Sequence, residues 1–309
     1  KIKINMYTIR ANFDFHYTFA LRNALRHVAD RLGFILIQDD SIPANSLYVN
    51  DKPIGYIVYE DAFHFVDQHI KHMNANDYQK IFKYHYSPNI IDYTKLPIDS
   101  KYLDRIIPCG LWRSWTSVEG NGGINYKWNK HDLLTRNRSI DVQATMRHTN
   151  SGTPPDPKDW PAWSNARLTL MNGARSMATE GYNTVVHMKP RDVYANSLKD
   201  TKLGFIWSAS SYLGWKIGEF IQEGVIMITE PLGKDYPLCN NVVLEDGVHC
   251  IFEKNPKNFV DVAKELLKDP AKMQEIKTNC LNLWEDKLSQ DKIGEWFFKE
   301  LIDAYNEGS

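Results

Sequence analysis

The chain has 309 residues, of which 43% are hydrophobic and 24% charged, and its formal net charge is −1 at neutral pH. This length suffices for two domains of about 100–200 residues, and the charge gives no support for nucleic-acid binding through bulk electrostatics. No run approaches the roughly 18 apolar residues of a membrane-spanning helix, and the scattered cysteines lack the CxxC spacing of zinc sites. We therefore expect a cytoplasmic protein that binds no nucleic acid and has no membrane span, with peripheral membrane association left open.

The first half of the chain alternates strand and helix signals. Apolar runs predict strands at residues 2–7, 34–38, 54–59, 80–85 and 105–107, and amphipathic patterns predict helices at 19–32 and 62–73. Strands separated by helical segments are typical of βαβ units with a mostly parallel sheet. The polar, glycine-rich segment 119–130 is typical of a linker, so we expect a first α/β domain over residues 1–130.

A second strand–helix series follows this linker. Strands are predicted at 139–145, 184–188, 203–207, 225–229, 241–244 and 249–252, and helices at 163–180, 212–223, 258–268 and 270–288. The prolines of residues 151–161 predict a loop there. The second α/β domain is expected over residues 131–288, and an amphipathic helix at 290–305 ends the chain.

The most informative stretch runs from the strand at 203–207 to the strand at 225–229. A loop of small residues, Ser208–Ser211, opens the helix at 212–223, and Gly224 ends it. A small-residue loop that opens a helix after a strand is a common anion site, because free N–H groups and the positive helix end point at the ligand. Lys216 and Glu219 share one face of this helix and suit a diphosphate and a ribose diol, or else form an ordinary solvated ion pair.

Two common nucleotide motifs are absent from the chain. Neither the GxGxxG dinucleotide fingerprint nor the GxxxxGK[ST] phosphate loop occurs. Their absence argues against nicotinamide-dependent oxidoreductases and P-loop kinases. Two α/β domains in series instead predict a cleft with a ligand beyond the carboxyl ends of the strands.

The pattern Gly214-x-Lys216-x-x-Glu219-x-x-x-x-Gly224, followed by VIMIT, resembles the nucleotide-sugar-binding signature of GT-B glycosyltransferases, most of all the exostosin-like and other small GT-B families. The resemblance covers roughly residues 200–285. The chain departs from the exostosin pattern by Lys216 in place of the usual Arg, and by Ile226-Met227 where a proline is common. The resemblance implies two Rossmann-like domains facing a central cleft, with segment 289–309 packing back on the N-terminal domain.

The resemblance also implies roles for individual residues on the donor side. Glu219 would accept hydrogen bonds from the ribose hydroxyls, and Lys216 would neutralise the diphosphate. Phosphate oxygens would be bound by the loop serines and by cations that follow strands, with Arg147 the first choice, although these cations also suit solvated loops. The expected donor-binding residues are Arg147, Lys189, Ser208, Ser210, Ser211, Lys216 and Glu219.

The catalytic base of an inverting enzyme would come from the first domain, as a carboxylate or histidine that takes the proton of the acceptor hydroxyl. Asp14 with His16, and Asp61, stand at predicted strand–helix junctions. Either aspartate could instead cap the following helix, which is the commoner use of Asp at such a position. A retaining enzyme would need no strong base. No DxD motif follows a hydrophobic strand, so we expect no metal site.

These inferences predict a metal-independent glycosyltransferase of the hexosyl or pentosyl type in polysaccharide biosynthesis. It would move a sugar from a UDP- or GDP-linked donor to a hydroxyl of a glycan or glycolipid acceptor, with no cofactor beyond this co-substrate. Two alternatives remain open: a nucleotide-sugar epimerase with a GT-B-like fold, and a non-catalytic module that binds a nucleotide or sugar.

Overall fold

The computed structural model describes residues 7–13, 19–58, 67–84, 94, 97–109, 128–146, 160–186, 191–207, 215–232 and 237–308. The chain divides into two compact units, and each has its own sheet with helices, so the predicted two-domain α/β fold is confirmed. Unit 1 comprises Lys1–Leu111, Asp235–Val242 and Lys287–Ser309, and unit 2 comprises Trp112–Lys234 and Val243–Asp286. Because residues 110–127 lie outside the described ranges, the predicted domain limit at residue 130 stays a prediction.

Unit 1 is built on a six-stranded sheet of order β2-β1-β3-β4-β5-β6. The strands are β1 Thr8–Ala11, β2 Ile35–Gln38, β3 Ser46–Val49, β4 Lys52–Val58, β5 Lys80–Lys83 and β6 Ile106–Pro108. The pairs β1–β2, β4–β5 and β5–β6 are parallel, while β3 is antiparallel to both β1 and β4. The sheet is therefore mostly parallel, as predicted, with one inserted antiparallel strand.

Strand β3 was not predicted from the sequence, and the first predicted strand, at residues 2–7, falls almost wholly on residues that the structure does not describe. Residues 1–6 lie outside the described part of the chain, and β1 begins only at Thr8. Strand β3 joins β4 through Asn50 and Asp51, whose φ angles are 46° and 69°. Two consecutive residues with positive φ form the kind of tight turn whose twist matches a hairpin. A four-residue strand without clear alternation gives little signal before its hairpin partner is known.

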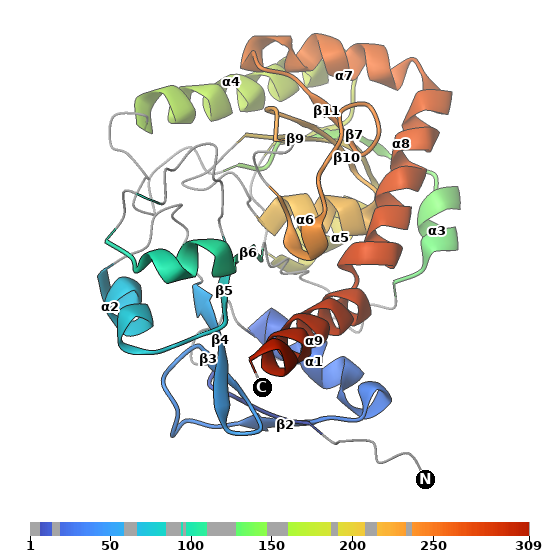
Figure 1. Ribbon diagram of the computed structural model, residues 1–309. Coiled ribbons are helices and arrows are strands. Elements are labelled where there is room, and N and C mark those ends of the chain that lie inside the picture. Colours follow the sequence, from blue (N-terminus) through green and yellow to red (C-terminus); the bar gives the residue numbers. More distant parts are fainter. Residues whose placement is uncertain are drawn as a thin grey trace. The chain divides into compact units, whose positions relative to one another are not determined.

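The helices of unit 1 pack as their apolar patterns predict. They are α1 Phe19–Leu32, α2 Asp67–Ala75, the 3₁₀ segments η3 Ser100–Arg105 and η5 Cys239–Asn241, and α9 Gln290–Glu307. The predicted stripe of α9 is buried, and the helix lies along α1 (Figure 1). At Gly294 a side-chain Cβ would stand 2.3 Å from the carbonyl oxygen of Ala24, so only glycine permits this close helix crossing.

A polar aromatic cluster lies inside unit 1, between α2 and the sheet. Tyr56 Oη is 2.6 Å from His69 Nδ1, and Tyr78 Oη is 2.8 Å from His72 Nε2 and 2.5 Å from Ser46 Oγ. Burial raises the pKa of Tyr78 to about 12, so its hydroxyl stays protonated. Burial, together with the neighbouring His69, lowers the pKa of His72 below its ordinary 6.5.

This shift makes the stability of unit 1 depend on pH. Below pH 6.5 the unfolded chain binds more protons at His72 than the folded chain does, so the free energy of unfolding should fall as the pH drops through 6.5 toward the lower folded-state pKa. We expect His72→Gln to flatten the fall in melting temperature between pH 7.5 and 5.5. The exposed His131, changed to Gln, is the control. Equal pH slopes in wild type and His72→Gln would contradict this prediction.

Unit 2 has a five-stranded sheet of order β11-β10-β9-β7-β8 in which every pairing is parallel. Its strands are β7 Ile140–Gln143, β8 Thr184–Val185, β9 Thr201–Ile206, β10 Ile226–Thr229 and β11 Cys250–Phe252. Its helices are α3 Lys130–Thr135, α4 Trp160–Thr179, α5 Arg191–Lys199, α6 Trp215–Glu223, η6 Pro256–Asn258, α7 Phe259–Leu267 and α8 Pro270–Leu283. Figure 1 shows α4 and α7 on one face of this sheet and α5 and α6 on the other, the layering of a doubly wound fold.

Helix α6 is fixed against the sheet by two glycines. Gly224 has φ 61° and ends the helix, as the sequence predicted. The bonds Gly224 N–H to Ile221 O and Val225 N–H to Phe220 O make this end a Schellman motif. On β9, a Cβ at Gly204 would lie 2.0 Å from the ring of Phe220. Without that side chain, the buried Phe220 packs directly on the strand and sets the height of α6 above the sheet.

Several element boundaries in the second half were predicted wrongly. The strand expected at 241–244 is absent, because Asn240 and Asn241 have φ angles of 57° and 55°, which a strand does not allow. The predicted proline loop ends early, since α4 begins at Trp160 and a proline is well tolerated in a first helical turn. The helix expected over 270–288 ends at Leu283 and continues as the π-helical turn Trp284–Leu288. Helices α3 and α5 were missed.

Candidate functional site

The strand order of unit 2 points to one edge of its sheet. Numbered along the unit, the strands lie in the order 2-1-3-4-5, so the winding direction reverses between the first strand, β7, and the third, β9. In open parallel sheets, ligands bind outside the carboxyl ends of strands at such a switch point. Thr145 lies just after β7, Trp207 just after β9 and Glu230 just after β10. The residues around these three positions are the candidate functional site.

Lys216 of α6 lies at this switch point. Its Nζ donates a hydrogen bond to Thr145 Oγ1 at 3.1 Å and stands 5.6 Å from the ring centre of Tyr194. Gln143 Nε2 also donates to Thr145 Oγ1, at 3.2 Å, and both of these β7-end side chains are buried. The predicted cation is therefore held beside the end of β7, where an anionic ligand at the switch point would meet it.

Glu219, one helical turn further along α6, is also part of this site. Its side chain is only 3% exposed, and its Oε2 accepts a hydrogen bond of 2.9 Å from the hydroxyl of Tyr194. Burial, followed by the charge of Glu219, raises the pKa of Tyr194 well above its ordinary value, so the phenol remains a donor. This burial rules out the alternative that Lys216 and Glu219 form a solvated surface pair.

Tyr194 was not predicted, because helix α5 itself was missed. The helix is anchored by Ser197 and Thr201, whose hydroxyls donate to Gln143 Oε1 at 3.4 and 2.8 Å. The Ser197 bond connects α5 to the carboxyl end of β7, and Thr201, which begins β9, donates to the same Gln143 oxygen. The nine residues of α5 carry several polar side chains, so the helical signal of this segment is weak.

Two further buried, charged residues lie at the same edge of the sheet. Arg167 of α4 and Glu230 after β10 are each 9% exposed, and Arg167 donates to the carbonyl of Trp207 at 3.2 Å. Burial lowers the pKa of Arg167 to about 10, against the opposing effect of the Glu230 carboxylate. Neither residue was predicted from the sequence. Glu230 could have been found, because it directly follows a predicted strand, and polar side chains at that position are expected to reach a ligand.

Most of the predicted site residues lie outside the part of the chain that the structure describes. Only Lys216 and Glu219 are described, and the structure brings them together with Tyr194 and Thr145. The positions that stay predictions are Asp14, His16, Asp61, Arg147, Lys189, Ser208, Ser210 and Ser211.

The described ranges contain neither a cluster of candidate metal ligands nor a helix suited to span a membrane. Within those ranges, His, Cys, Asp and Glu side chains form no group of three or more that could hold a metal ion. The four cysteines are free and buried. Of the helices described, none combines the length and the apolar character needed to cross a bilayer.

Comparison with known proteins yields only distant similarity. No protein-family model and no curated protein matches the chain. Among solved structures, it is similar to Anabaena Alr3699/HepE in complex with UDP, at 11% identity and a TM-score of 0.49, over 82% of this chain and 72% of that one. A glycosyltransferase from Rickettsia africae gives 10% identity and a TM-score of 0.47, over 96% of this chain and 83% of that one.

A third similar structure is the GtfA/B complex, with 12% identity and a TM-score of 0.47, over 83% of this chain and 54% of the other. These structural neighbours include glycosyltransferases, but all three scores lie below 0.5. At such scores the similarity does not indicate the activity of this chain. The proposed activity is therefore based on the residues of the chain itself.

Proposed function

We propose that this protein is a GT-B glycosyltransferase that uses a nucleoside-diphosphate sugar. The observation that supports this most is the position of the signature residues: Lys216 and Glu219 lie together at the switch point of a parallel 2-1-3-4-5 sheet. A cation beside the carboxyl ends of the strands suits a diphosphate, and a carboxylate one turn away suits the two hydroxyls of a ribose.

In this proposal the donor binds along the first turns of α6. Lys216 keeps its place beside Thr145 and neutralises the diphosphate, while Glu219 accepts hydrogen bonds from the ribose. The hydroxyl of Tyr194 orients the carboxylate, because it already donates to one of the two oxygens. Arg167, buried beside Trp207, adds positive charge at the same edge. Arg147, Lys189 and the loop serines are proposed to complete the phosphate contacts.

The acceptor is proposed to be a hydroxyl of a glycan or glycolipid. Asp14 with His16, or Asp61, is proposed as the base that removes its proton in an inverting reaction. The reaction is proposed to proceed without a metal ion, because Lys216 and the other cations neutralise the charge on the departing diphosphate.

Ligand-dependent thermal stabilisation tests this proposal on the wild-type protein. UDP, GDP, CMP, dTDP and their sugars are added at increasing concentrations, and the melting temperature is followed. A ligand at 100 times its dissociation constant should stabilise the fold by about 2.7 kcal/mol, which corresponds to a shift of several degrees. No shift with any of these nucleotides, from well-folded protein, would overturn the proposal.

Once a donor is identified, its turnover separates the remaining alternatives. A glycosyltransferase releases the nucleoside diphosphate, and release accelerates when an acceptor glycan is present. A nucleotide-sugar epimerase exchanges solvent hydrogen at a sugar carbon without an acceptor. A binding module gives the thermal shift with neither reaction.

A further inference from the structure

Unit 1 has a switch point of its own, between β1 and β4. Its parallel strands lie along the sheet in the order β2-β1-β4-β5-β6, and the antiparallel β3 is inserted between β1 and β4. The chain therefore passes from β1 outward to β2, and it then builds the sheet in the opposite direction from β4. In open parallel sheets, ligands bind outside the carboxyl ends of strands at such a reversal.

Asn45 lies at the carboxyl ends of the two strands that flank this reversal. It directly precedes β3, which runs antiparallel to both of them. Its backbone N–H donates to Asn12 O, just after β1, at 2.7 Å, and its carbonyl accepts a bond of 2.9 Å from the N–H of Ile57 in β4. With both backbone groups bonded and a φ of 62°, Asn45 is fixed at the switch point.

The side-chain amide of Asn45 has an acceptor that the fold leaves unused. The residue is 5% exposed, and its Oδ1 is buried and accepts no hydrogen bond from the described residues. Buried polar atoms are nearly always hydrogen-bonded in native proteins, because an unmade bond to a buried acceptor is destabilising. A non-glycine residue with positive φ adds a second local cost, and such costs are concentrated where ligands bind.

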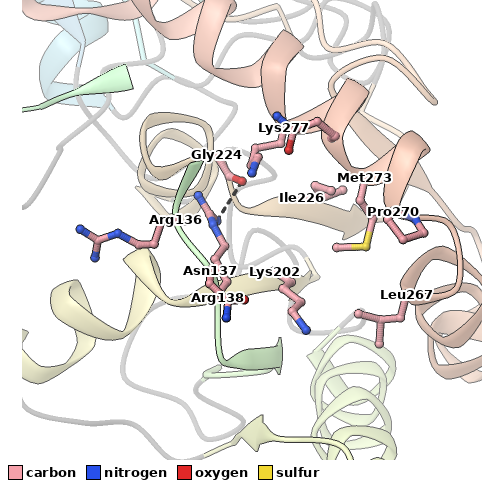
Figure 2. Close-up of a pocket in the computed structure, with 11 residues that line it drawn as sticks. Arg136, Asn137, Arg138, Lys202, Gly224, Ile226, Leu267, Pro270, Met273 and Lys277 are labelled. Carbon is pink, nitrogen blue, oxygen red and sulfur yellow. Dashed lines mark hydrogen bonds between the residues drawn. The ribbon is translucent and has the colours of Figure 1, made fainter. Parts of the chain in front are cut away.

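The cavity of unit 2 shows the opposite situation. It has a volume of about 260 Å³ and is lined in part by the buried Arg138. This guanidinium donates to the carbonyls of Thr201, Glu223 and Gly224, and Figure 2 shows the bond to Gly224. These donors are therefore satisfied within the protein, whereas the Oδ1 of Asn45 is an acceptor that a ligand can satisfy.

A second amide lies beside Asn45. Asn12 is 8% exposed and directly follows β1, and its Nδ2 donates to Ile42 O at 2.9 Å. That bond orients the amide and leaves its Oδ1 as the atom that can meet a ligand. Because both amides offer an acceptor oxygen, a ligand that bonds to both must supply O–H or N–H donors.

The charges at this edge do not select a cationic ligand. Asp39 follows β2, and its carboxylate is already paired with Arg10 at 2.5 Å. Neutral amide oxygens instead suit neutral donors such as the hydroxyl groups of a sugar.

We propose that the switch point of unit 1 binds a carbohydrate, with one sugar hydroxyl donating to Oδ1 of Asn45 and another to Oδ1 of Asn12. The binding site itself is inferred from unit 1 alone. Its use as the acceptor site rests on the glycosyltransferase proposal, in which Asn45 binds and positions the acceptor sugar.

Saturation-transfer NMR titrations with simple glycosides test this proposal. The probes are the methyl α- and β-glycosides of glucose, galactose, mannose and N-acetylglucosamine, and at least one of them should bind to the wild-type protein. Asn45→Gly should weaken that binding about tenfold, because a hydroxyl of the bound sugar loses its acceptor. Glycine adopts positive φ without strain, so this variant should melt no lower than the wild type when no ligand is present.

Asn50→Gly is the matched control. Asn50 also has a positive φ, of 46°, but it lies at the other end of β3, so glycoside binding should stay unchanged. Equal binding by the wild type and Asn45→Gly, or equal weakening in Asn50→Gly, would overturn the proposal. An absence of glycoside binding to the folded wild-type protein would overturn it as well.

The thermal shift with nucleotides, measured on the same variants, separates this site from the donor site of unit 2. Glycoside binding that depends on Asn45, in a protein without any nucleotide shift, supports the carbohydrate site and contradicts the glycosyltransferase proposal. A nucleotide shift in a protein whose glycoside binding is unaffected by Asn45→Gly supports the donor site and contradicts the carbohydrate site.

Discussion

Replacing Glu219 with Gln is expected to abolish the thermal stabilisation that a nucleotide or nucleotide sugar gives to the wild-type protein. The carboxylate is proposed to accept two ribose hydrogen bonds, and bonds to charged groups contribute about 1.5–3 kcal/mol each. Gln keeps the size of the side chain and one acceptor for the Tyr194 hydroxyl, but it replaces the other acceptor oxygen with a donor. We expect donor affinity to fall about 100-fold or more.

The control for this result is Glu265→Gln, which changes an exposed carboxylate on α7 and should leave the nucleotide shift unaltered. The melting temperature of each variant without ligand shows whether its fold is intact. Tyr194→Phe should weaken the donor less than Glu219→Gln does, because it removes only the group that orients the carboxylate. A full nucleotide shift in a well-folded Glu219→Gln variant would show that Glu219 only supports the packing of Tyr194.

Replacing Arg138 with Met is expected to cause the largest loss of stability among the substitutions considered. The side chain is 6% exposed and donates to the carbonyls of Thr201, Glu223 and Gly224. It thereby connects the start of β7 to the start of β9 and to the end of α6. Met fills much of the space but donates no hydrogen bond, so three carbonyls lose this donor, at a combined cost of about 3–5 kcal/mol.

The neighbouring Arg136 provides the matched control. Its side chain is 31% exposed and pairs with Asp132, so Arg136→Met should cost less than about 1 kcal/mol. Urea denaturation, together with hydrogen exchange at the amides of β7 and β9, measures the loss within unit 2, since two units need not unfold in one step. A stability of Arg138→Met equal to that of Arg136→Met would contradict the proposed anchoring role.

Long elements with a regular pattern were predicted well from the sequence. The helix predicted at 19–32 is α1, and the apolar stripe of the last helix is buried in α9. Gly224 marks the end of α6 as expected, because a Schellman motif needs a residue with positive φ. In each case the signal is local: it depends on periodicity or on the conformational freedom of one residue.

Short and polar elements were predicted poorly. Strand β3 has only four residues, and helix α5 lacks a clear apolar period, so neither is recognisable before its partners are known. The missed helix carries Tyr194, whose hydroxyl donates a hydrogen bond to Glu219. The sequence therefore predicted the cation and the carboxylate of the candidate site, but not the phenol that orients the carboxylate.

Local patterns in the chain were enough to predict the α/β class, the strand β9 and the helix α6 with Lys216 and Glu219, and the glycine that ends this helix. Three features could be seen only in the folded molecule: the strand order that puts these residues at a switch point, the burial of Glu219, and the membership of Asp235–Val242 in unit 1. This difference arises because propensity, periodicity and capping act over a few neighbouring residues. Strand order, burial and the contacts of Arg138 depend instead on which distant segments pack together. Hydrophobic burial stabilises that packing, but no short stretch of the sequence indicates which segments will meet.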